Sequence, residues 1–398
     1  MAVPITYQQL VDRTDHFAPP AVLTAAAPLS RMRYPDGHVG WLATGLEVAK
    51  EVLSSPAFSH NFHSAHFPLL KKGQPFPSMP IIPGMFIHMD PPEHTRYRGM
   101  LTAEFGAGRM AEITPRVQEI AAGQLDVLRT QGSPADLLSA YIRPLVLRVL
   151  SEVVGVPYED SPVLAALADT ANDDEVPLED EFAAEKKAFF LTRDLVERAR
   201  VSPGDDILGR LTAIGGLSDR EITNMLLVVF VAGFATCEGA VAAAALALLH
   251  HGDQLVAFRA AAASGRGTES AVEELLRHTT VNQYQIFRTA LEDVRLHGEL
   301  VRKGDTVTVS LPAANRDPAR FGCPAHLDLD REDAAGHIAF GYGPHACVGQ
   351  RLGRAVVGTA LETLVLGLPE PALDEPLEDI PLRARTPVLS VQRLPVRW

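Results

Sequence analysis

The segment 340–349 (FGYGPHACVG) places Cys347 in a glycine-rich loop directly before an expected helix over 349–366. Unpaired backbone N–H groups and the helix dipole at such a position stabilise a thiolate, the form of cysteine that binds metals. A cysteine that only fills a core does not need this setting. Cys237 and Cys323 lack it, and 3 unevenly spaced cysteines predict neither a disulfide framework nor a Cys-x-x-Cys zinc site.

The spacing Phe-x-x-Gly-x-x-x-Cys-x-Gly in this loop resembles the haem-binding loop of the cytochrome P-450 monooxygenases. The resemblance implies that the cofactor is haem b, iron protoporphyrin IX, with Cys347 as the thiolate ligand of its iron. It also implies that Phe340 packs beside the sulfur and that Gly341 lets backbone amides point at it. Gly349 is then expected to allow a close approach to the haem face.

Haem carries two propionates, and their burial requires cations or other strong donors. By the same resemblance, the residues at the family's positions for this task are His94, Arg98, Arg288 and His345. His94 and Arg98 lie one helical turn apart, which places them on one face of an expected helix. We therefore expect these side chains to converge on the propionates.

A second motif is Glu274-Leu275-Leu276-Arg277, with opposite charges at i and i+3. Alone it is typical of a surface ion pair. Together with the Cys347 loop it resembles the Glu-x-x-Arg motif of the same family, whose third member is an arginine such as Arg331. The resemblance implies a buried network that supports folding more than catalysis.

The segment 225–249 is apolar enough and long enough to span a bilayer. Glu238 lies at its middle, where an acid costs about 2.5–3.5 kcal/mol on insertion scales. The first residues contain neither a signal peptide nor an anchor pattern. We therefore expect a cytoplasmic protein outside the membrane, in which this segment is a helix buried on all sides that lines something.

By resemblance, this helix crosses the distal face of the haem with the motif Ala/Gly-Gly-x-acid-Thr-Thr. Gly233 and Thr236 match the motif, but Ala235 occupies the acid position and can neither accept nor give a proton. Glu238, three residues on and on the same face, is the candidate substitute; the alternative is that it is paired elsewhere. A substrate hydroxyl or a file of ordered water acting through Thr236 is another proton source, and a locally opened helix would free that hydroxyl.

The stretch 58–90 is rich in Pro, Phe and Met and has no helical or strand periodicity. A loop of this length is often functional, and by resemblance it covers the substrate pocket. The residues expected to contact substrate are Phe76, Met79, Met85, Phe234, Gln283, Gln285 and Val388. Most are apolar with a few polar groups, which indicates a lipophilic small molecule.

Helical patterns dominate, with short strand signals near both ends, so the fold class is mainly α with a small β region. Expected helices cover 93–105, 115–130, 135–154, 179–201 and the central segment, which begins at the capping box of Ser218 and Glu221. A hairpin over 29–34 and 38–43 leads to a helix ending near 53, strands cover 301–311 with a turn at Gly304, and a hairpin ends the chain. The resemblance implies the P-450 fold, with haem buried between the central helix and the Cys347 loop.

The composition agrees with this interpretation. With 398 residues, 46% hydrophobic and 21% charged, the chain can bury a large core and is not disordered. A net charge of −13 excludes nucleic acid as a general partner. Because no flexible linker divides the sequence, we expect one domain over 1–398.

The resemblance implies a monooxygenase that inserts one oxygen atom from O₂ into a lipophilic molecule by hydroxylation or epoxidation. Tailoring of a secondary metabolite such as a polyketide, macrolide or terpenoid is the expected role. The sequence has no dinucleotide-binding loop, so electrons from NAD(P)H are expected through a separate ferredoxin reductase and ferredoxin. The ferredoxin would dock on a basic patch of Arg96, Arg351 and Arg354, and the enzyme is expected to be a monomer.

Two alternatives stay open. Ala235 also suits a haem-thiolate enzyme that catalyses oxidative coupling or a peroxide-driven oxidation, because such reactions do not need the usual proton relay. A haem-binding accessory protein without turnover is the second alternative, and the presence of Cys347 argues against it.

Overall fold

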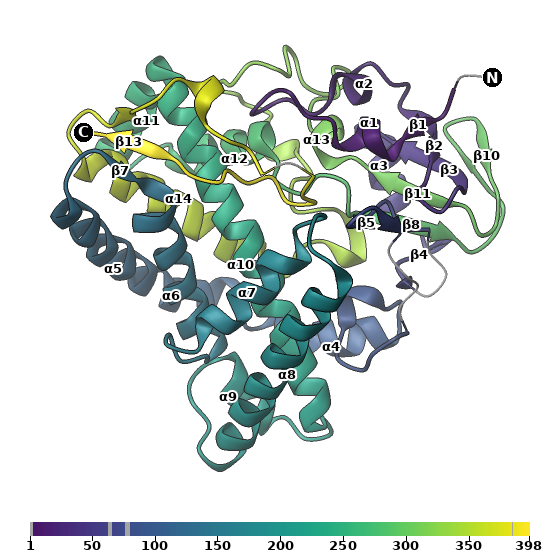
Figure 1. Cartoon of the computed structure of the whole chain (residues 1–398), viewed down its shortest axis with the longest axis horizontal. Helices are drawn as coiled ribbons and strands as arrows, with labels where there is room; N and C mark the ends of the chain where they lie inside the picture. The colour runs from purple at the N-terminus through teal and green to yellow at the C-terminus, as the bar shows by residue number, and fades with distance from the viewer. Residues whose placement is uncertain (1–2, 63–65, 76–79, 384) are drawn as a thin grey trace.

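The computed structural model describes residues 3–62, 66–75, 80–383 and 385–398, and it is mainly helical with a small β region (Figure 1). The α-helices are α1 (Tyr7–Val11), α2 (Ala21–Thr24), α3 (Leu46–Ser54), α4 (Glu93–Thr102), α5 (Ala107–Gln131), α6 (Arg143–Val154), α7 (Ser161–Ala171), α8 (Leu178–Val201), α9 (Ile207–Ala213), α10 (Asp219–His250), α11 (Gly252–Ser264), α12 (Thr268–Thr279), α13 (Leu311–Ala314) and α14 (Gln350–Gly367). A π-helical turn, η3 (Leu138–Ile142), precedes α6.

The largest sheet joins segments from both ends of the chain. Its strands, in spatial order, are β1 (Ile5–Thr6), β2 (Leu29–Arg33), β3 (Val39–Ala43), β11 (Thr306–Val309), β8 (Phe287–Ala290) and β4 (Phe58–Ser59). The smaller sheets pair β9 (Val294–Leu296) with β10 (Glu299–Val301), β5 (Leu70–Lys71) with β6 (Gln74–Pro75), and β13 (Pro395–Arg397) with both β12 (Ala372–Leu373) and β7 (Ala135–Asp136). In Figure 1 the large sheet lies on the right, beside the helical part.

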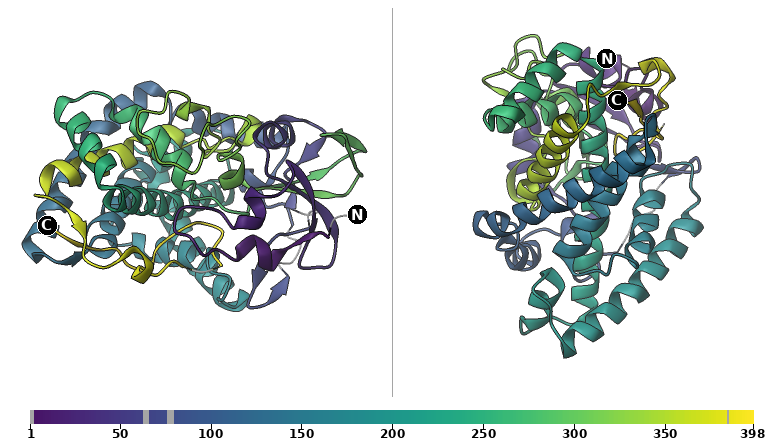
Figure 2. Two further views of the ribbon diagram at one scale, coloured as in Figure 1. Left: turned by 90° about the horizontal axis from the view of Figure 1, so that it is seen from above. Right: turned by 90° about the vertical axis from the view of Figure 1, so that its left-hand side faces the viewer.

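Helix α10 passes through the centre of the helical part, where α6, α7, α8 and α14 pack around it (Figure 2). It begins at the predicted capping box, in which the Ser218 hydroxyl and the Glu221 carboxylate satisfy each other's backbone amides. By length and composition α10 could cross a membrane, but 61% of its most apolar window is buried inside the protein. It is therefore a core helix, as the sequence predicts.

Several other predicted elements are confirmed. Strands β2 and β3 form the expected antiparallel hairpin around Gly37, whose φ of 91° suits a turn glycine. Helices α8 and α14 begin and end within one residue of the predicted limits. The stretch 58–90 contains, where it is described, only short strands and a 3₁₀ turn, η2 (Phe86–His88).

Two predicted helix boundaries are wrong. Helix α5 begins at Ala107, so Pro115 lies inside it, because the apolar face of Met110 and Val117 continues through the proline. The segment 135–154 is a strand and a π-helical turn before α6, because the backbone of Ala135 pairs with β13. The predicted turn at Gly304 is present between β10 and β11, but the two strands pair with other partners, β10 with β9 and β11 with β3 and β8.

A buried lysine joins the 58–90 segment to the corner between α7 and α8. Lys71 Nζ donates to the carbonyls of Thr170, Ala171 and Asp173 at 2.8, 3.0 and 3.1 Å. It also forms an ion pair with Glu181 at 3.0 Å. These donors satisfy carbonyls at the C-terminal end of α7 that have no helical partner. The 58–90 segment is thereby held against α7 and α8.

Asp174, beside this lysine, accepts hydrogen bonds from the hydroxyls of Tyr7 and, at 3.1 Å, Tyr284. Burial raises the pKa of Asp174 to about 6 despite these donors and Lys71. The folded state therefore binds a proton more tightly than the unfolded chain, whose carboxyl has an ordinary pKa of about 3.9.

We expect Asp174→Asn to become more stable relative to the wild type as pH rises from 4 to 7. The wild type loses stability through this window as Asp174 ionises, by up to about 3 kcal/mol, whereas asparagine does not ionise. Urea unfolding of both proteins at pH 4, 5, 6 and 7 measures the difference. A difference that stays constant across the window would contradict a raised pKa.

Candidate active site

The Cys347 loop is held in a tight backbone conformation. Gly341 and Gly343 both have φ of 73°, a region that side chains disfavour. A Cβ on Gly343 would clash with the backbone carbonyl of Leu53 at the end of α3. The Cys347 amide donates to the Phe340 carbonyl at 2.8 Å, which closes the loop just before α14. Phe340 packs against Gly353 of α14 and the guanidinium of Arg354.

Cys347 lies inside the protein but is accessible to solvent. Burial raises the pKa of its thiol, while a hydrogen bond from the Gly349 amide and the charges of Arg98 and Arg354 act in the opposite direction. The residue is nevertheless solvent-accessible. A residue can be both surrounded by protein and accessible to solvent when it lines an internal hollow, and we infer that Cys347 does so. The predicted backbone amide at the sulfur is present, from Gly349.

The middle of α10 faces the same hollow. Residues 222–228 and 238–249 of this helix are buried, but Ala232 is exposed, and Val229, Gly233 and Thr236 on the same face are half-buried. Burial and the nearby Cys347 raise the pKa of Cys237, also in this stretch, to about 12. The hollow therefore lies between the centre of α10 and the Cys347 loop.

A cluster of cations and imidazoles lies at one edge of the hollow. Arg288 is buried, its pKa is lowered to about 10 by burial, and no described carboxylate lies within ion-pairing distance of it or of Arg98. His94 is also buried, and neither of its ring nitrogens has a partner among the described residues. The ring of His345 lies 3.9 Å from that of His94. Buried Arg288 and half-buried Arg98, neither of them paired with a described acid, match a ligand with two carboxylates.

The Glu-x-x-Arg residues form the predicted buried network. Arg277 donates to both carboxylate oxygens of Glu274 at 2.6 and 2.8 Å, and both side chains are fully buried. Arg331 Nε lies 3.1 Å from the same carboxylate. Arg277 also donates to the carbonyls of Asn315 and Pro324, each at 2.9 Å. The network joins α12 to the irregular segment that leads to the Cys347 loop.

Comparison with known proteins agrees with this geometry. A sequence model of the family described as "Cytochrome P450" matches residues 267–368. The chain is 37% identical to cytochrome P450 105C1 from Streptomyces sp, over 100% of this chain and 99% of that protein. The chain belongs to the cytochrome P450 family. It is 33% identical to the monooxygenase PikC from Streptomyces venezuelae, over 95% of this chain and 90% of PikC.

The fold matches that of solved cytochromes P450. The crystal structure of CYP105P1 in complex with filipin I superposes with a TM-score of 0.91 at 31% identity, covering 100% of this chain and 98% of that one. This P450 is therefore an oxidoreductase of the monooxygenase class, and its family implies haem and an external supply of electrons. The residues around the hollow fit haem: a thiol at one wall, and at one edge a buried and a half-buried guanidinium without described acids.

Thr236 of this P450 is bonded to its own helix. Its hydroxyl donates to the Ala232 carbonyl at 2.7 Å, with Gly233 O at 3.4 Å. Helix α10 is continuous through this point, so the opened helix that would free the hydroxyl is not present. Gly233 is half-buried, and a Cβ there would contact Leu150 of α6.

Glu238 is buried and paired. Its Oε2 accepts from Arg143 at 3.0 Å, and Arg143 also binds Asp169 of α7 at 2.6 Å. Burial is the first cause that raises the pKa of Glu238, and Asp169 adds to it. A small cavity of about 20 Å³ is lined by both Ala235 and Glu238, enough space for about one water molecule.

Neither Arg143 nor Asp169 was found from the sequence, because a lone arginine and a lone aspartate carry no motif. The residues lining the small cavity are Ala168, Asp169, Asn172, Ala235, Glu238, Arg383, Thr386, Val388 and Ser390. Asp169 and Arg383 are each about one-third exposed, with their charged atoms 3.6 Å apart. The cavity therefore joins Ala235 to groups that reach solvent.

The structure changes the list of substrate contacts. Phe234 is fully buried, with the Arg143 guanidinium 4.8 Å from its ring, so it faces away from the hollow. The expected substrate contact by Phe234 is therefore wrong. The Gln283 amide accepts from Arg13 and donates to the Thr280 and Val281 carbonyls, which engages both of its N–H groups within the protein. Gln283 is half-buried, and its contact with substrate stays a prediction.

The other residues predicted to contact substrate differ in how far they are buried. Met85 and Gln285 are half-buried. Val388 is buried, pairs through its backbone with Asn282, and lines the small cavity. Phe76 and Met79 lie outside the described residues.

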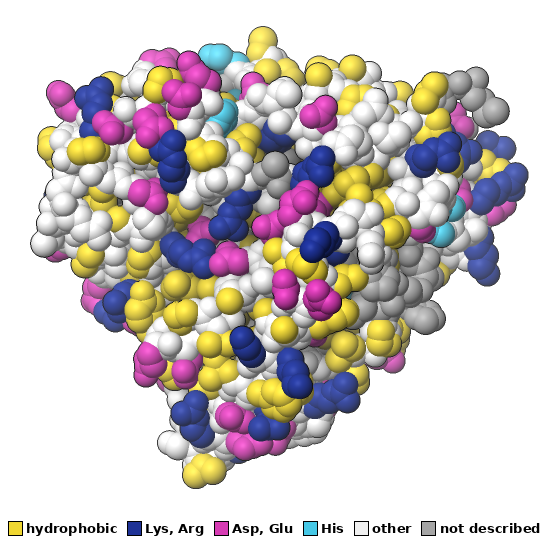
Figure 3. All heavy atoms as spheres, viewed as in Figure 1, with side chains coloured by type: hydrophobic (Ala, Val, Ile, Leu, Met, Phe, Trp, Pro, Cys, Tyr) yellow, Lys and Arg dark blue, Asp and Glu magenta, His cyan; other side chains and the backbone are white. Residues whose placement is uncertain are grey.

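The predicted basic patch is not formed. Arg354 pairs with Glu273 through two hydrogen bonds at 2.5 and 3.0 Å, and Arg96 pairs with Glu221 at 3.0 Å. Arg351 is exposed. Beside the Cys347 loop, Tyr342 is exposed and the ammonium of Lys50 lies 5.8 Å from its ring. On the face of the molecule that Figure 3 draws, acidic and basic side chains are interspersed.

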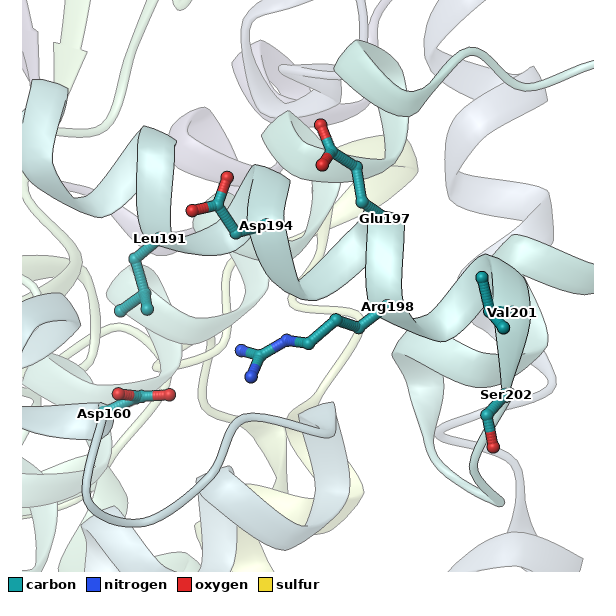
Figure 4. Close-up of a pocket in the computed structure, with 7 residues that line it drawn as sticks. All are labelled: Asp160, Leu191, Asp194, Glu197, Arg198, Val201 and Ser202. Carbon is teal, nitrogen blue, oxygen red and sulfur yellow. The ribbon is translucent and has the colours of Figure 1, made fainter.

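A separate open hollow lies on the outer side of α8 (Figure 4). It is lined by Asp160, Leu191, Asp194, Glu197, Arg198, Val201 and Ser202, and the Arg198 side chain extends toward Asp160. None of these residues is in the Cys347 loop or in the cation cluster. This surface feature is therefore distinct from the internal hollow.

Proposed function

We propose that this P450 inserts one oxygen atom from O₂ into a lipophilic secondary metabolite, by hydroxylation or epoxidation. The observation that carries the proposal is Cys347 facing the centre of α10 across an internal hollow. A polyketide, macrolide or terpenoid is the proposed substrate class. The support is the name of PikC as a monooxygenase and the filipin I bound in CYP105P1.

The proposed cofactor is haem b, with Cys347 as iron ligand. Bound haem supplies an iron that activates O₂, and thiolate ligation favours O–O cleavage. Arg98, Arg288, His94 and His345 are proposed to hold the propionates. Phe340, Gly341 and Gly349 shape the loop around the sulfur, and the hydrogen bond from the Gly349 amide stabilises the thiolate.

The proposed electron source is NAD(P)H through a ferredoxin reductase and a ferredoxin, and the proposed state is a cytoplasmic monomer. Because Arg96, Arg354 and Lys50 are paired with acids, the docking surface proposed for the ferredoxin is centred on exposed Arg351 and Tyr342 beside the Cys347 loop. An acidic partner would be attracted to the Arg351 guanidinium there.

The proposed proton route passes through Glu238 and the small cavity to Ala235, the residue next to Thr236. Ala235 cannot carry a proton, but it lines the cavity together with Glu238, so one water there would adjoin both residues. Burial keeps the pKa of Glu238 above its usual range, which favours a carboxyl that can give a proton. Asp169 and Arg383 link the cavity to solvent.

We expect Glu238→Gln to lower product formed per NAD(P)H about tenfold, because the amide keeps the size of the side chain but cannot transfer a proton. Electrons not used for product should appear as hydrogen peroxide. Parallel assays of NAD(P)H, product and peroxide measure the ratio. Exposed Glu332 provides a matched control, Glu332→Gln. Unchanged coupling in Glu238→Gln would exclude this carboxyl from proton delivery.

The experiment that tests the function is product analysis under isotopically labelled O₂. The enzyme is reconstituted with ferredoxin, its reductase and NAD(P)H, and supplied with lipophilic natural products that shift its absorption spectrum. Incorporation of one labelled atom supports monooxygenation. A product without label would identify oxidative coupling instead.

A further inference from the structure

His60, at the end of β4, lies at the edge of the hollow and matches no motif in the sequence. Its backbone amide donates to Asp90 Oδ1 at 2.8 Å, and the neighbouring Ser59 hydroxyl donates to the other oxygen of Asp90. Asp90 precedes α4, which carries His94 and Arg98. Asp90 therefore holds the end of β4 beside α4, and its own oxygens are already engaged.

The His60 ring extends into the cation cluster. It lies 4.5 Å from the ring of His345 in an edge-to-face arrangement. Its Nδ1 is buried and has no hydrogen-bond partner among the residues that the structure describes. Burial, followed by the charges of Arg288 and His345, holds the pKa of His60 well below its usual range. The ring is therefore a neutral imidazole with one N–H to donate.

A buried polar nitrogen without a partner is costly, so its presence needs an explanation. Arg98 and Arg288 already balance the charge of two carboxylates. Two carboxylates, however, have four oxygens, each of which accepts hydrogen bonds. The remaining carboxylate oxygens need hydrogen-bond donors that add no further positive charge. A neutral imidazole is such a donor.

We propose that His60 is a further hydrogen-bond donor to a carboxylate of the haem, acting beside His94, Arg98, Arg288 and His345. The proposal rests on the proposed haem cofactor and assigns it one more binding residue. A donor from β4 attaches the cofactor to the large sheet as well as to α4 and the Cys347 loop. His60 would therefore slow the release of haem.

The test measures the rate at which haem leaves the protein for an excess of apomyoglobin. We expect His60→Phe to release haem about tenfold faster than the wild type, because phenylalanine fills the space but cannot donate. His60→Gln, whose amide can donate, should restore part of the slower rate. His297→Gln, in an exposed turn between β9 and β10, is the matched control and should equal the wild type.

A second cofactor separates a carboxylate contact from packing. The same proteins are loaded with iron etioporphyrin, in which alkyl groups replace the propionates, so that no side-chain oxygen remains to accept a hydrogen bond. If His60 donates to a carboxylate, His60→Phe and wild type release this porphyrin at similar rates. Equal acceleration for haem and iron etioporphyrin, or no acceleration for haem, would overturn the proposal.

A carbon monoxide spectrum distinguishes failure of the His60 proposal from failure of the proposed function. Each protein is first reduced and exposed to carbon monoxide. A wild type without the red-shifted Soret band of thiolate ligation would refute the haem-thiolate assignment. A wild type with that band, but with haem release insensitive to His60, would refute only the role of His60.

Discussion

Replacing Cys347 by alanine is expected to abolish the red-shifted Soret band of the reduced carbon monoxide complex and to reduce product formation to background. The red shift depends on thiolate ligation of the haem iron, and alanine offers no ligand. The cation cluster at the edge of the hollow does not include Cys347, so the variant should still take up haem. Absorption spectra of the loaded variant, with haem content determined separately, measure both effects.

The other two cysteines provide the controls. Cys323 is exposed, and Cys237 is half-buried on α10, so Cys323→Ala and Cys237→Ala should both retain the red-shifted band. Retention of the band in Cys347→Ala would show that another residue ligates the iron. Loss of the band only in Cys237→Ala would show that Cys237 of α10, and not Cys347, ligates the iron.

Glu274→Gln is expected to lower the free energy of unfolding by about 3–5 kcal/mol. The carboxylate accepts from fully buried Arg277 and lies 3.1 Å from Arg331, so its loss leaves buried guanidinium charge without an acid. The amide has almost the same shape, which separates the effect of charge from that of packing. Urea unfolding followed by circular dichroism measures the change.

The matched control is an exposed ion pair. Asp293 and Arg302 are 2.8 Å apart but half or more exposed, and Asp293→Asn should therefore cost less than about 1 kcal/mol. If Glu274→Gln is too unstable to purify, the reduced yield of soluble protein relative to Asp293→Asn reports the same loss. If the free energy of unfolding of Glu274→Gln lies within about 1 kcal/mol of the wild-type value, the network contributes little to folding.

Most of the fold class and the central features of the site were predictable from local pattern. The Ser218 capping box, the turn at Gly37 and the glycine-rich Cys347 loop each depend on a few adjacent residues. The 225–249 segment is apolar on every face, which requires a buried helix wherever it lies. Short-range chemistry determines these elements, so the sequence alone specifies them.

The helix boundaries that failed depend on partners far along the chain. Ala135 leaves the expected helix because β13 pairs with it. Pro115 is accommodated inside α5 because the apolar face on both sides of it packs into the core. Neither partner is visible in the local pattern, since each contact joins segments distant in sequence.

The direction in which each side chain points was decided by the tertiary structure. A helix buried on all sides gives no periodicity to tell which face meets a cofactor, so only packing shows that Phe234 faces Arg143 while Thr236 faces the hollow. His60 reaches the cation cluster only because Asp90 holds β4 beside α4. The sequence by itself determined that a thiolate loop and a buried apolar helix exist. The packing of distant segments decided which charges are paired, and hence which groups remain free to bind.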